Sequence, residues 1–537
     1  MTSIPAFDAD GARLGRLGER TVLIGTRETV QALGAQLKAA LPGLKAAGCI
    51  VVSPEGRPVE AAGARNGAAA LPVLGGFEQL PDAHRVLSFT LAIVCLPGEL
   101  ATWQLRVRAR LRELGIPIRS IAPLGELLSR GVPDPARVLP SEVNVVELIG
   151  RTPYGIDRRS VADVLTGKRV LITGAGGSIG SELARIAATF HPQQLILMER
   201  AENALFEIDR QIARRFPDVA RRALLHDVTD ADATLRHCVA LRPQVVFHAA
   251  AHKHVPLMED HPSHAVVNNL FGTKSIADAS MAVDAERFVL ISSDKAVNPT
   301  SVMGATKRLA EIYTQWLNGR GRTRCCMVRF GNVLGSACSV LPIWTGQLGE
   351  GGPLTVTDAR MTRYFMTIHE AATLVIQAAA ISSDAAASAV FVLDMGEPVR
   401  ILDLARRFVR AHGFEPRVVT RDGQPAPGEP GDAAGHGAPV LDIVLTGVRP
   451  GEKLYEELAY AAEGLLPTRC PGIRAWTSDV AQGVDVSTMI ADLSAARHAH
   501  DRQQVIEAIR RHVPDSRLTD TVASELQAKG EGVIRAA

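Results

Sequence analysis

The sequence has 537 residues, of which 46% are hydrophobic and 22% charged, a balance typical of folded globular proteins and not of disordered or fibrous ones. At roughly 150 residues per domain, this length predicts two to four domains. Lysine and arginine number 59 and aspartate and glutamate 57, so no overall field favours binding to nucleic acid or to an anionic membrane. We therefore expect no nucleic-acid partner, and any anion site must be local.

The seven cysteines are scattered, without a CxxC pair and without histidines at ligand spacing. This pattern predicts no metal site and no disulfide framework, and it fits a reducing cytoplasm. No apolar run approaches the ~20 residues needed to cross a bilayer, and the first ten residues lack the features of a signal peptide. We therefore expect a cytoplasmic protein with no integral membrane segment in this sequence.

Two segments resemble each other, residues 21–25 (TVLIG) and 169–174 (RVLITG), each a short β-branched run that ends at glycine. Both are typical of the first strand and turn of a parallel α/β unit. Further expected elements are strands near 49–53 and 91–96 and a helix near 102–114. The turn after Gly25 lacks the second and third glycines of a dinucleotide loop. We interpret residues 1–125 as a small Rossmann-like α/β domain that binds no dinucleotide.

The rest of the chain divides by composition. Residues 126–167 carry several prolines and few apolar runs, which predicts a connector. Strand and helix patterns then alternate through residues 168–475, the expected catalytic domain, interrupted at 423–439 by a Gly/Pro-rich stretch that predicts a flexible surface insertion. Residues 476–537 form a tail with helical periodicity, to which we assign no catalytic role.

The strongest motif reads VLITGAGGSIG and runs from Val170 to Gly180, between a strand pattern and a helix pattern. A TGxxGxxG turn in this context permits a tight bend, close approach of a dinucleotide, and placement of its pyrophosphate at the helix N-terminus. The motif therefore predicts a dinucleotide site. The expected contacts are Gly174, Gly177, Ser178, Ile179 and Gly180.

The next expected strand, 194–198, ends at Glu199, where an acidic residue would accept the hydroxyls of the adenosine ribose. This favours NAD over NADP as the cofactor. The adjacent Arg200 could instead bind a 2′-phosphate, and Glu199 could be a solvated strand end, so NADP stays open. Further expected cofactor contacts are Asp227 and Val228, after the third strand, and Ala249 and Ala250, whose small side chains leave room beside the fourth.

Six more motifs follow in order: HAAAHKHVPLME from His248, NLFGT from Asn269, ISSDKAVNPTSVMGATK from Ile291, RFGNVLGS from Arg329, MTRYFMTI from Met361 and TGVRPGEKLYEE from Thr446. Together they resemble the polysaccharide-biosynthesis sugar-nucleotide dehydratases, extended short-chain dehydrogenase/reductases that include the UDP-N-acetylglucosamine 4,6-dehydratases. The resemblance is close over residues 168–475. It implies a doubly wound parallel sheet with a smaller substrate-binding subdomain.

Two features depart from the pattern of that family. Many relatives carry a membrane-embedded region before the small α/β domain, and this sequence has none, which fits a soluble form or a shortened chain. After Ser336 the family commonly shows Arg and then Gly, whereas Ala337 and Cys338 stand here. One contact of the substrate loop is therefore in question.

The resemblance also assigns roles in catalysis. Reductases of this class use Tyr-x-x-x-Lys, but the tyrosine position is Met303, which cannot move a proton, while Lys307 can still bind the nicotinamide ribose. Some of the resembling dehydratases carry the same methionine. By resemblance, Lys295 removes the proton from carbon 5, Asp294 protonates the leaving hydroxyl of carbon 6, and Ser293 assists at the carbon 4 hydroxyl. A neutral lysine and a protonated aspartate both require burial.

The implied substrate is a UDP-sugar, UDP-N-acetylglucosamine, converted to its 4-keto-6-deoxy form with tightly bound NAD. Arg449 is expected at the pyrophosphate and Glu452 at the uridine ribose. The other expected substrate contacts are Lys253, His254, Asn269 and Asn332. A homo-oligomer is expected because members of this class often pair through helices.

Two other functions stay open. A sugar-nucleotide 4-epimerase or reductase would share the cofactor site and Lys307, but it normally needs tyrosine in place of Met303 and has no use for Asp294 and Lys295. A catalytically silent NAD-sensing or scaffold protein would explain the loss of the tyrosine.

Overall fold

The computed structural model describes residues 20–40, 46–53, 71–96, 153–381, 390–412, 414–427, 440–460, 464–476, 483–498 and 501–518, with parts of 100–120. The chain divides into two compact units, Met1–Glu147 and Leu148–Ala537. The sequence instead predicts boundaries at residues 125 and 167. Most of the expected connector, and most of the Gly/Pro-rich stretch 423–439, lie outside the described residues.

The first unit is built on a parallel sheet in the order β3-β2-β1-β4-β5. Its strands are β1 (Thr21–Gly25), β2 (Ala46–Val51), β3 (Val73–Gly76), β4 (Leu91–Cys95) and β5 (Ile118–Ser120), and its helices include α1 (Arg27–Ala40), α2 (Leu80–Leu87) and the short η1 (Phe77–Gln79). The described residues between 103 and 113 are helical. The expected strands and the helix near 102–114 are thus found where their patterns lie.

The turn after β1 is tightly closed by its own side chains. The Thr29 hydroxyl donates to the Cys95 carbonyl at 2.6 Å, and a Cβ added to Gly25 would lie 2.2 Å from the same oxygen. The end of β1 is therefore filled by Thr29, and that this unit binds no dinucleotide stays a prediction.

The second unit contains a nine-stranded sheet in the order β20-β21-β16-β11-β10-β9-β6-β7-β8. The strands are β6 (Arg169–Thr173), β7 (Gln194–Glu199), β8 (Arg221–Leu225), β9 (Val245–His248), β10 (Arg287–Ile291), β11 (Arg324–Arg329), β16 (Val390–Leu393), β20 (Leu466–Pro467) and β21 (Ile473–Trp476). From β8 to β16 all neighbours pair in parallel. The chain order reverses between β6 and β9, and ligands of doubly wound folds bind at such a point. The expected α/β fold with a doubly wound parallel sheet is confirmed.

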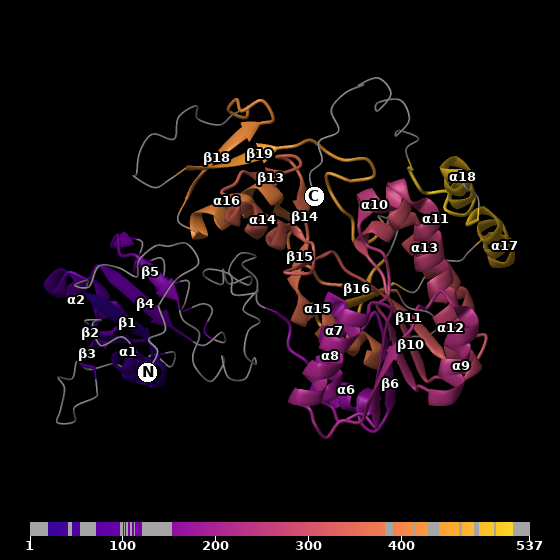
Figure 1. Ribbon diagram of the computed structural model, residues 1–537, viewed down its shortest axis with the longest axis horizontal. Coiled ribbons are helices and arrows are strands. Elements are labelled where there is room, and N and C mark those ends of the chain that lie inside the picture. Colours follow the sequence, from indigo (N-terminus) through magenta and orange to yellow (C-terminus); the bar gives the residue numbers. More distant parts are fainter. Residues whose placement is uncertain are drawn as a thin grey trace. The chain divides into compact units, whose positions relative to one another are not determined.

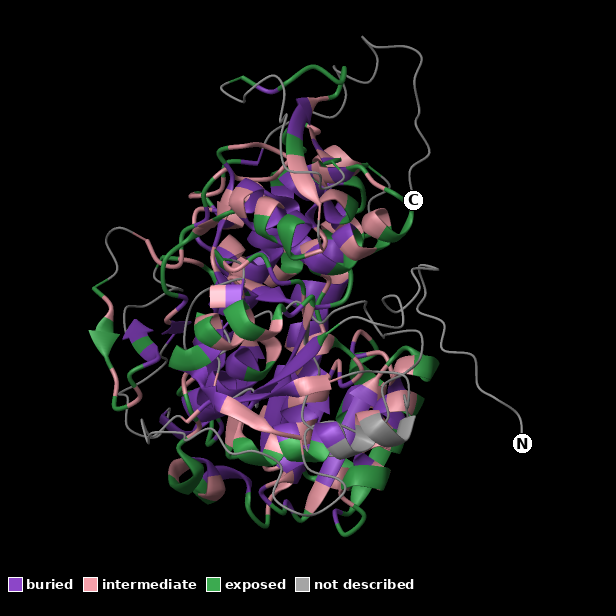
Figure 2. Cartoon of the chain, turned by 90° about the vertical axis from the view of Figure 1, so that its left-hand side faces the viewer, coloured by how far each residue is buried: buried purple, intermediate pink, exposed green. Residues whose placement is uncertain are grey.

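Helices cover both faces of this sheet (Figure 1). One layer contains α6 (Arg158–Leu165), α7 (Ser178–Ala188), α8 (Glu202–Arg215) and α15 (Ile368–Ile381), and the other α9 (Ala231–Leu241), α12 (Gly272–Ala282) and α13 (Val302–Leu317). Each layer forms its own hydrophobic core with the strands, because parallel strands bury both faces. The central strands are accordingly buried (Figure 2).

Helix α6 corrects the expected connector. It begins after Asp157, whose carboxylate accepts hydrogen bonds from the amides of Arg159 and Ser160. Val161 and Leu165 are buried in the same core as α15. The last part of the expected connector is therefore a helix of the second unit.

A smaller subdomain carries the remaining strands. Its sheets are β13-β19-β18, β12-β15 and β14-β17, formed by β12 (Asn332–Leu334), β13 (Leu354–Val356), β14 (Thr362–Arg363), β15 (Phe365–Thr367), β17 (Val399–Arg400), β18 (Glu415–Thr420) and β19 (Val440–Leu445). Helices α14 (Val340–Gly349) and α16 (Ile401–Ala411) pack on β13. Short helices follow two strands of the large sheet: α10 (Val255–Asp260), α11 (Pro262–Ala265) and the π-helix η4 (Val266–Phe271) come after β9, and the 3-10 helix η5 (Asp294–Ala296) comes after β10.

The tail forms two helices, α17 (Val486–Ala496) and α18 (Arg502–His512), as its periodicity predicts. Both contact α13, and α18 also contacts α11. Residues 519–537 lie outside the described residues. Among the described residues, no helix is long and apolar enough to cross a membrane.

Candidate active site

The glycine-rich turn joins β6 to α7 at the point where the sheet order reverses. Gly174 has φ of 63°, and a Cβ there would lie 2.8 Å from the carbonyl carbon of Ala249. A Cβ at Gly180 would lie 2.1 Å from the Gly174 oxygen. Gly177 is the N-cap of α7, and the partly buried Ser178 and Ile179 form its first turn. The turn therefore brings two backbones together and leaves the helix N-terminus accessible.

A cavity of about 190 Å³ lies beside this turn. Eight of the predicted cofactor residues line it: Gly174, Gly177, Glu199, Arg200, Asp227, Val228, Ala249 and Ala250. They come from the ends of β6, β7 and β9 and from the segment after β8. The structure thus brings together residues that are spread over 77 positions of sequence, from Gly174 to Ala250.

Two carboxylates stand at this cavity. Glu199 accepts hydrogen bonds from the backbone amides of Gly176 at 3.1 Å, Arg200 at 2.9 Å and Ala201 at 3.0 Å. Partial burial raises the pKa of Asp227, but hydrogen bonds from Thr229 and the charge of Arg200 outweigh it, so this pKa lies below its usual value. The Arg200 guanidinium donates to Asn268 at 3.3 Å and lies 3.8 Å from the Asp227 carboxylate.

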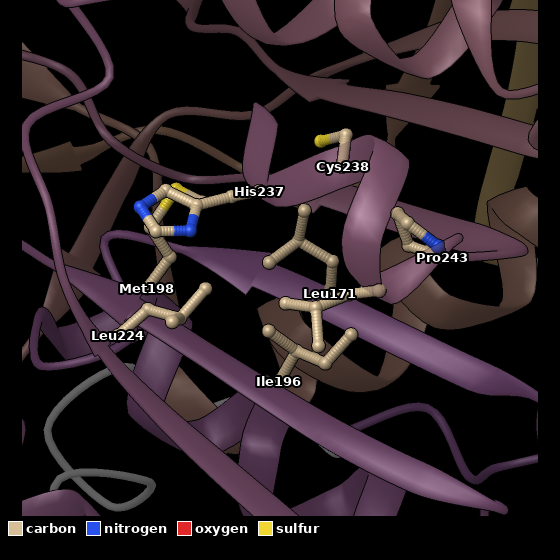
Figure 3. A pocket seen from close by; sticks show the side chains of 8 residues that line it. Leu171, Ile196, Met198, Leu224, His237, Cys238 and Pro243 are labelled. Carbon is tan, nitrogen blue, oxygen red and sulfur yellow. The ribbon is translucent and has the colours of Figure 1, made fainter. Parts of the chain in front are cut away.

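An apolar gap lies near this cavity, between the sheet and α9 (Figure 3). Leu171, Ile196 and Leu224 line it from adjacent strands, and Cys238 lines it from α9. The gap has no volume for the centre of a water molecule, and burial raises the pKa of Cys238 to about 11. The gap is therefore too small for a water molecule, and burial disfavours the thiolate of Cys238.

The predicted catalytic segment follows β10 directly. Ser293 is the N-cap of η5, and its hydroxyl donates to Asp294 Oδ1 at 2.8 Å. Lys295 Nζ donates to the same oxygen at 3.0 Å and to Asn332 Oδ1 at 3.2 Å. The Asp294 side chain is 0% exposed and that of Lys295 20%. The structure therefore places these four residues in one hydrogen-bonded group, in which Asp294 is buried and the other three are partly buried.

Charge governs the protonation of Lys295. Burial lowers the pKa of its ammonium, but the carboxylates of Asp294 and Glu456 outweigh that effect and raise this pKa above its usual value. Asp294 Oδ2 is buried and has no hydrogen-bond partner. In the resting protein the pair is therefore an ion pair with one unused acceptor oxygen.

Helix α13 carries the other two predicted residues. Lys307 Nζ donates to the carbonyl of Ile291, the last residue of β10, at 2.5 Å. Burial lowers the pKa of Lys307 to about 8, although the Glu311 carboxylate acts in the opposite direction. Met303 is 3% exposed and belongs to the core under α13. The position of the usual tyrosine is thus filled by an apolar side chain.

Four of the predicted substrate contacts form two pairs of sequence neighbours, Lys253 with His254 and Arg449 with Glu452. Lys253 donates to the Ala337 carbonyl at 2.7 Å, and the Ala337 amide donates to Ser178 at 3.0 Å, so this loop joins the glycine-rich turn through its backbone. Burial lowers the pKa of Lys253, and burial together with Lys253 lowers that of His254. The Arg449 side chain is 60% exposed and lies 3.1 Å from Glu452.

Asn269 differs from the expectation. It is 0% exposed, accepts from the His252 amide at 2.8 Å, and donates to the His252 carbonyl and to Thr306, both at 3.1 Å. All of its polar atoms are engaged inside the protein. Asn269 therefore fixes the loop after β9 and is not open to a substrate.

Sequence reasoning missed the second carboxylate of this group, Glu456. Its side chain is 3% exposed, and its Oε1 lies 3.8 Å from Lys295 Nζ and 3.7 Å from the Arg363 guanidinium. The motif LYEE contains this residue, but nothing in the letters distinguishes buried Glu456 from exposed Glu457. Among the described residues, no cluster of His, Cys, Asp and Glu could bind a metal ion.

The chain is similar in sequence to several known proteins. The chain is 43% identical over 390 residues to a probable polysaccharide biosynthesis protein, EpsC, of Bacillus subtilis, covering 72% of this chain but only 60% of that protein. It is 29% identical over 302 residues to a UDP-N-acetylglucosamine 4,6-dehydratase (inverting) of Campylobacter jejuni, covering 55% of this chain and 78% of that one. The solved structure of Pen from Bacillus thuringiensis matches with a TM-score of 0.50 and 29% identity, over 59% of this chain and 92% of that chain.

The family model described as polysaccharide biosynthesis protein matches residues 170–477. This range begins in β6, includes the glycine-rich turn, and contains the buried group around Lys295. Because the match covers more than half of the chain, the protein belongs to this family of polysaccharide biosynthesis proteins.

Proposed function

We propose that the protein is a sugar-nucleotide 4,6-dehydratase that converts UDP-N-acetylglucosamine to its UDP-4-keto-6-deoxy form. The observation that carries this proposal is the buried Asp294–Lys295 pair, whose side chains meet at 3.0 Å after β10. Elimination of water needs one base and one acid, whereas 4-epimerisation has no use for such a pair. The similar protein of Campylobacter jejuni bears the name of this activity.

The cavity at the glycine-rich turn fits the adenosine half of NAD. The Glu199 carboxylate stands where ribose hydroxyls can donate to it, and Asp227 can accept from the adenine amino group. A side chain at Gly174 or Gly180 would collide with backbone, as expected where a turn must close on a dinucleotide. When bound, NAD would accept a hydride from carbon 4 of the sugar and return it to carbon 6.

The same geometry favours NAD over NADP. The Glu199 carboxylate accepts from three backbone amides and would repel a 2′-phosphate. Arg200, which could otherwise bind that phosphate, is directed to Asn268 and Asp227. Lys307, fixed to the end of β10, would bind the nicotinamide ribose.

Proton transfer within the pair supplies both catalysts. Moving one proton from Lys295 Nζ to Asp294 Oδ1, across 3.0 Å, gives a neutral lysine and a protonated aspartate. Lys295 then takes the proton from carbon 5, and Asp294 gives its proton to the hydroxyl that leaves carbon 6. Lys295 later returns its proton to carbon 5 of the sugar. The proton that the carbon 4 hydroxyl releases passes through Ser293 to Asp294, so the pair ends the turnover with the one proton with which it began.

Ser293 and Asn332 complete the group. Met303 cannot move a proton, so we assign the carbon 4 hydroxyl to Ser293, whose own hydroxyl is bonded to Asp294. Asn332 orients the Lys295 ammonium through a 3.2 Å hydrogen bond. The exposed Arg449 guanidinium suits the pyrophosphate of the substrate, and Glu452 beside it suits the uridine ribose.

Product mass tests the proposal. Purified protein incubated with UDP-N-acetylglucosamine, without added reductant, should yield a nucleotide sugar lighter by one water. A 4-epimerase would leave the mass unchanged and alter the proton spectrum of the sugar, and a silent scaffold would change neither. Either of those two results overturns the proposal.

A further inference from the structure

Glu456 and Arg363 lie beside the catalytic pair but have no role in the reaction derived above. Arg363 donates to the backbone carbonyls of Lys453 at 2.8 Å and Leu454 at 3.2 Å, and so anchors the segment that carries Glu456. Glu456 Oε1 lies between the two cations, 3.8 Å from Lys295 and 3.7 Å from Arg363. The anchoring therefore fixes a second carboxylate at the ammonium.

This carboxylate is deeply buried and incompletely bonded. The side chain of Glu456 is 3% exposed, and its Oε2, like Asp294 Oδ2, has no hydrogen-bond partner. A buried carboxylate with an open oxygen costs free energy unless charge compensates it. Its position is thus explained by its charge and not by a hydrogen-bond network.

Four charged groups surround Lys295: the carboxylates of Asp294 and Glu456, the Arg363 guanidinium, and the Lys453 ammonium, which donates to the Val297 carbonyl at 2.8 Å. With all of them ionised, the two carboxylates face three cations, Lys295 included. Loss of Glu456 would leave Asp294 as the only carboxylate among these groups. The retention of a proton on Lys295 therefore depends on Glu456.

Lys307 provides an internal comparison. It is also buried, but its carboxylate, Glu311, is bonded to Arg329 at 2.7 Å. Burial lowers the pKa of Lys307 to about 8, whereas the pKa of Lys295, which faces two carboxylates, is raised. Burial with one shared carboxylate thus lets a lysine lose its proton above about pH 8.

We propose that Glu456 is a positioning residue that keeps one proton on the Asp294–Lys295 pair. This inference rests on the proposed dehydratase reaction, which requires the pair to hold one proton at the start and at the end of each turnover. A pair that has lost this proton can still remove hydrogen from carbon 5 but cannot protonate the leaving hydroxyl. Elimination then fails on the alkaline side.

The test is the pH dependence of water loss from UDP-N-acetylglucosamine, measured by product mass between about pH 7 and pH 10 as the ratio of variant to wild-type rate. Glu456→Gln keeps the shape and removes the charge, so Lys295 should lose its proton at lower pH. The ratio should fall by about tenfold or more across this range, since each unit of pKa corresponds to tenfold in proton affinity. The titration of Lys307 occurs in the wild type and in every variant, so its effect on the rate cancels in this ratio.

Two further variants make the test specific. Glu457→Gln changes the exposed neighbouring glutamate, and its ratio should stay constant with pH. Glu456→Asp retains the negative charge but holds it farther from Lys295. The ratio of its rate to the wild-type rate should therefore fall at a higher pH than the ratio for Glu456→Gln. Circular dichroism and bound-NAD content check that each variant is folded.

Each outcome decides one question. A constant ratio for folded Glu456→Gln, or an equal fall for Glu457→Gln, overturns the role of Glu456 while the dehydratase stands. If Glu456→Gln does not fold, a constant ratio for Glu456→Asp overturns the role instead. If wild-type protein removes no water from the substrate, the proposed function itself fails.

Discussion

The buried ion pair between Arg329 of β11 and Glu311 of α13 should be costly to break by removing one partner, but much less costly to replace by two apolar residues. Arg329 Nε and Nη2 donate to the two oxygens of Glu311, each at 2.7 Å, and both side chains are 0% exposed. Arg329→Met should lower the free energy of unfolding by about 3–5 kcal/mol, because it leaves a buried carboxylate without its main partner. Hydrogen bonding from Ser292 at 2.7 Å and the charge of Arg308 at 3.4 Å should keep the loss near the lower end of that range.

The double variant Arg329→Met/Glu311→Leu distinguishes charge from packing. It removes both charges and should regain most of the loss, leaving about 1 kcal/mol, the lower end of the cost of the buried Ser292 hydroxyl that loses its acceptor. Urea unfolding followed by tryptophan fluorescence suits this measurement, since the Trp476 ring lies 5.3 Å from the Arg329 guanidinium. A single variant that loses less than about 1 kcal/mol, or a double variant no more stable than the single one, would refute the reasoning.

Three predictions concern the cofactor. Gly180→Ala should release the bound dinucleotide, because its Cβ would lie 2.1 Å from the Gly174 oxygen; chromatography of the extracted nucleotide measures this, and full retention contradicts it. Glu199→Ser should improve binding of NADP relative to NAD by removing the carboxylate that repels a 2′-phosphate, as measured by calorimetry; an unchanged ratio of affinities speaks against that role. One NAD should be retained per chain, since Thr29 fills the end of β1 in the first unit, and a second equivalent would show this to be wrong.

The sequence was sufficient to predict those features that depend only on neighbouring residues along the chain. Strand β10 spans Arg287–Ile291 as its apolar run predicts, and the residues after a parallel strand must lie at the carboxyl edge of the sheet. Ser293, Asp294 and Lys295 are therefore placed by local sequence alone. Helix α6 was missed although its signal was present, an Asp157 cap before Val161 and Leu165 at helical spacing.

Other features depend on contacts between distant segments. Glu456 meets Lys295 across 161 positions of sequence, and only the fold shows that it is buried while Glu457 is exposed. Asn269 was expected to contact the substrate, but its amide is engaged by His252 and Thr306. An asparagine can form hydrogen bonds either to a ligand or to buried groups of the protein, and the local sequence does not show which of the two it does.

The most direct test of the proposed mechanism is the fate of the proton on carbon 5 in deuterated water. Wild-type protein should form the 4-keto-6-deoxy product with solvent deuterium at that carbon, because the intermediate is reprotonated there. Lys295→Met should retain bound NAD and lose product formation by about 10²–10⁴-fold, the usual contribution of a general base. If Lys295→Met still forms the product at nearly the wild-type rate with deuterium at carbon 5, Lys295 is not the base and the proposed mechanism is wrong.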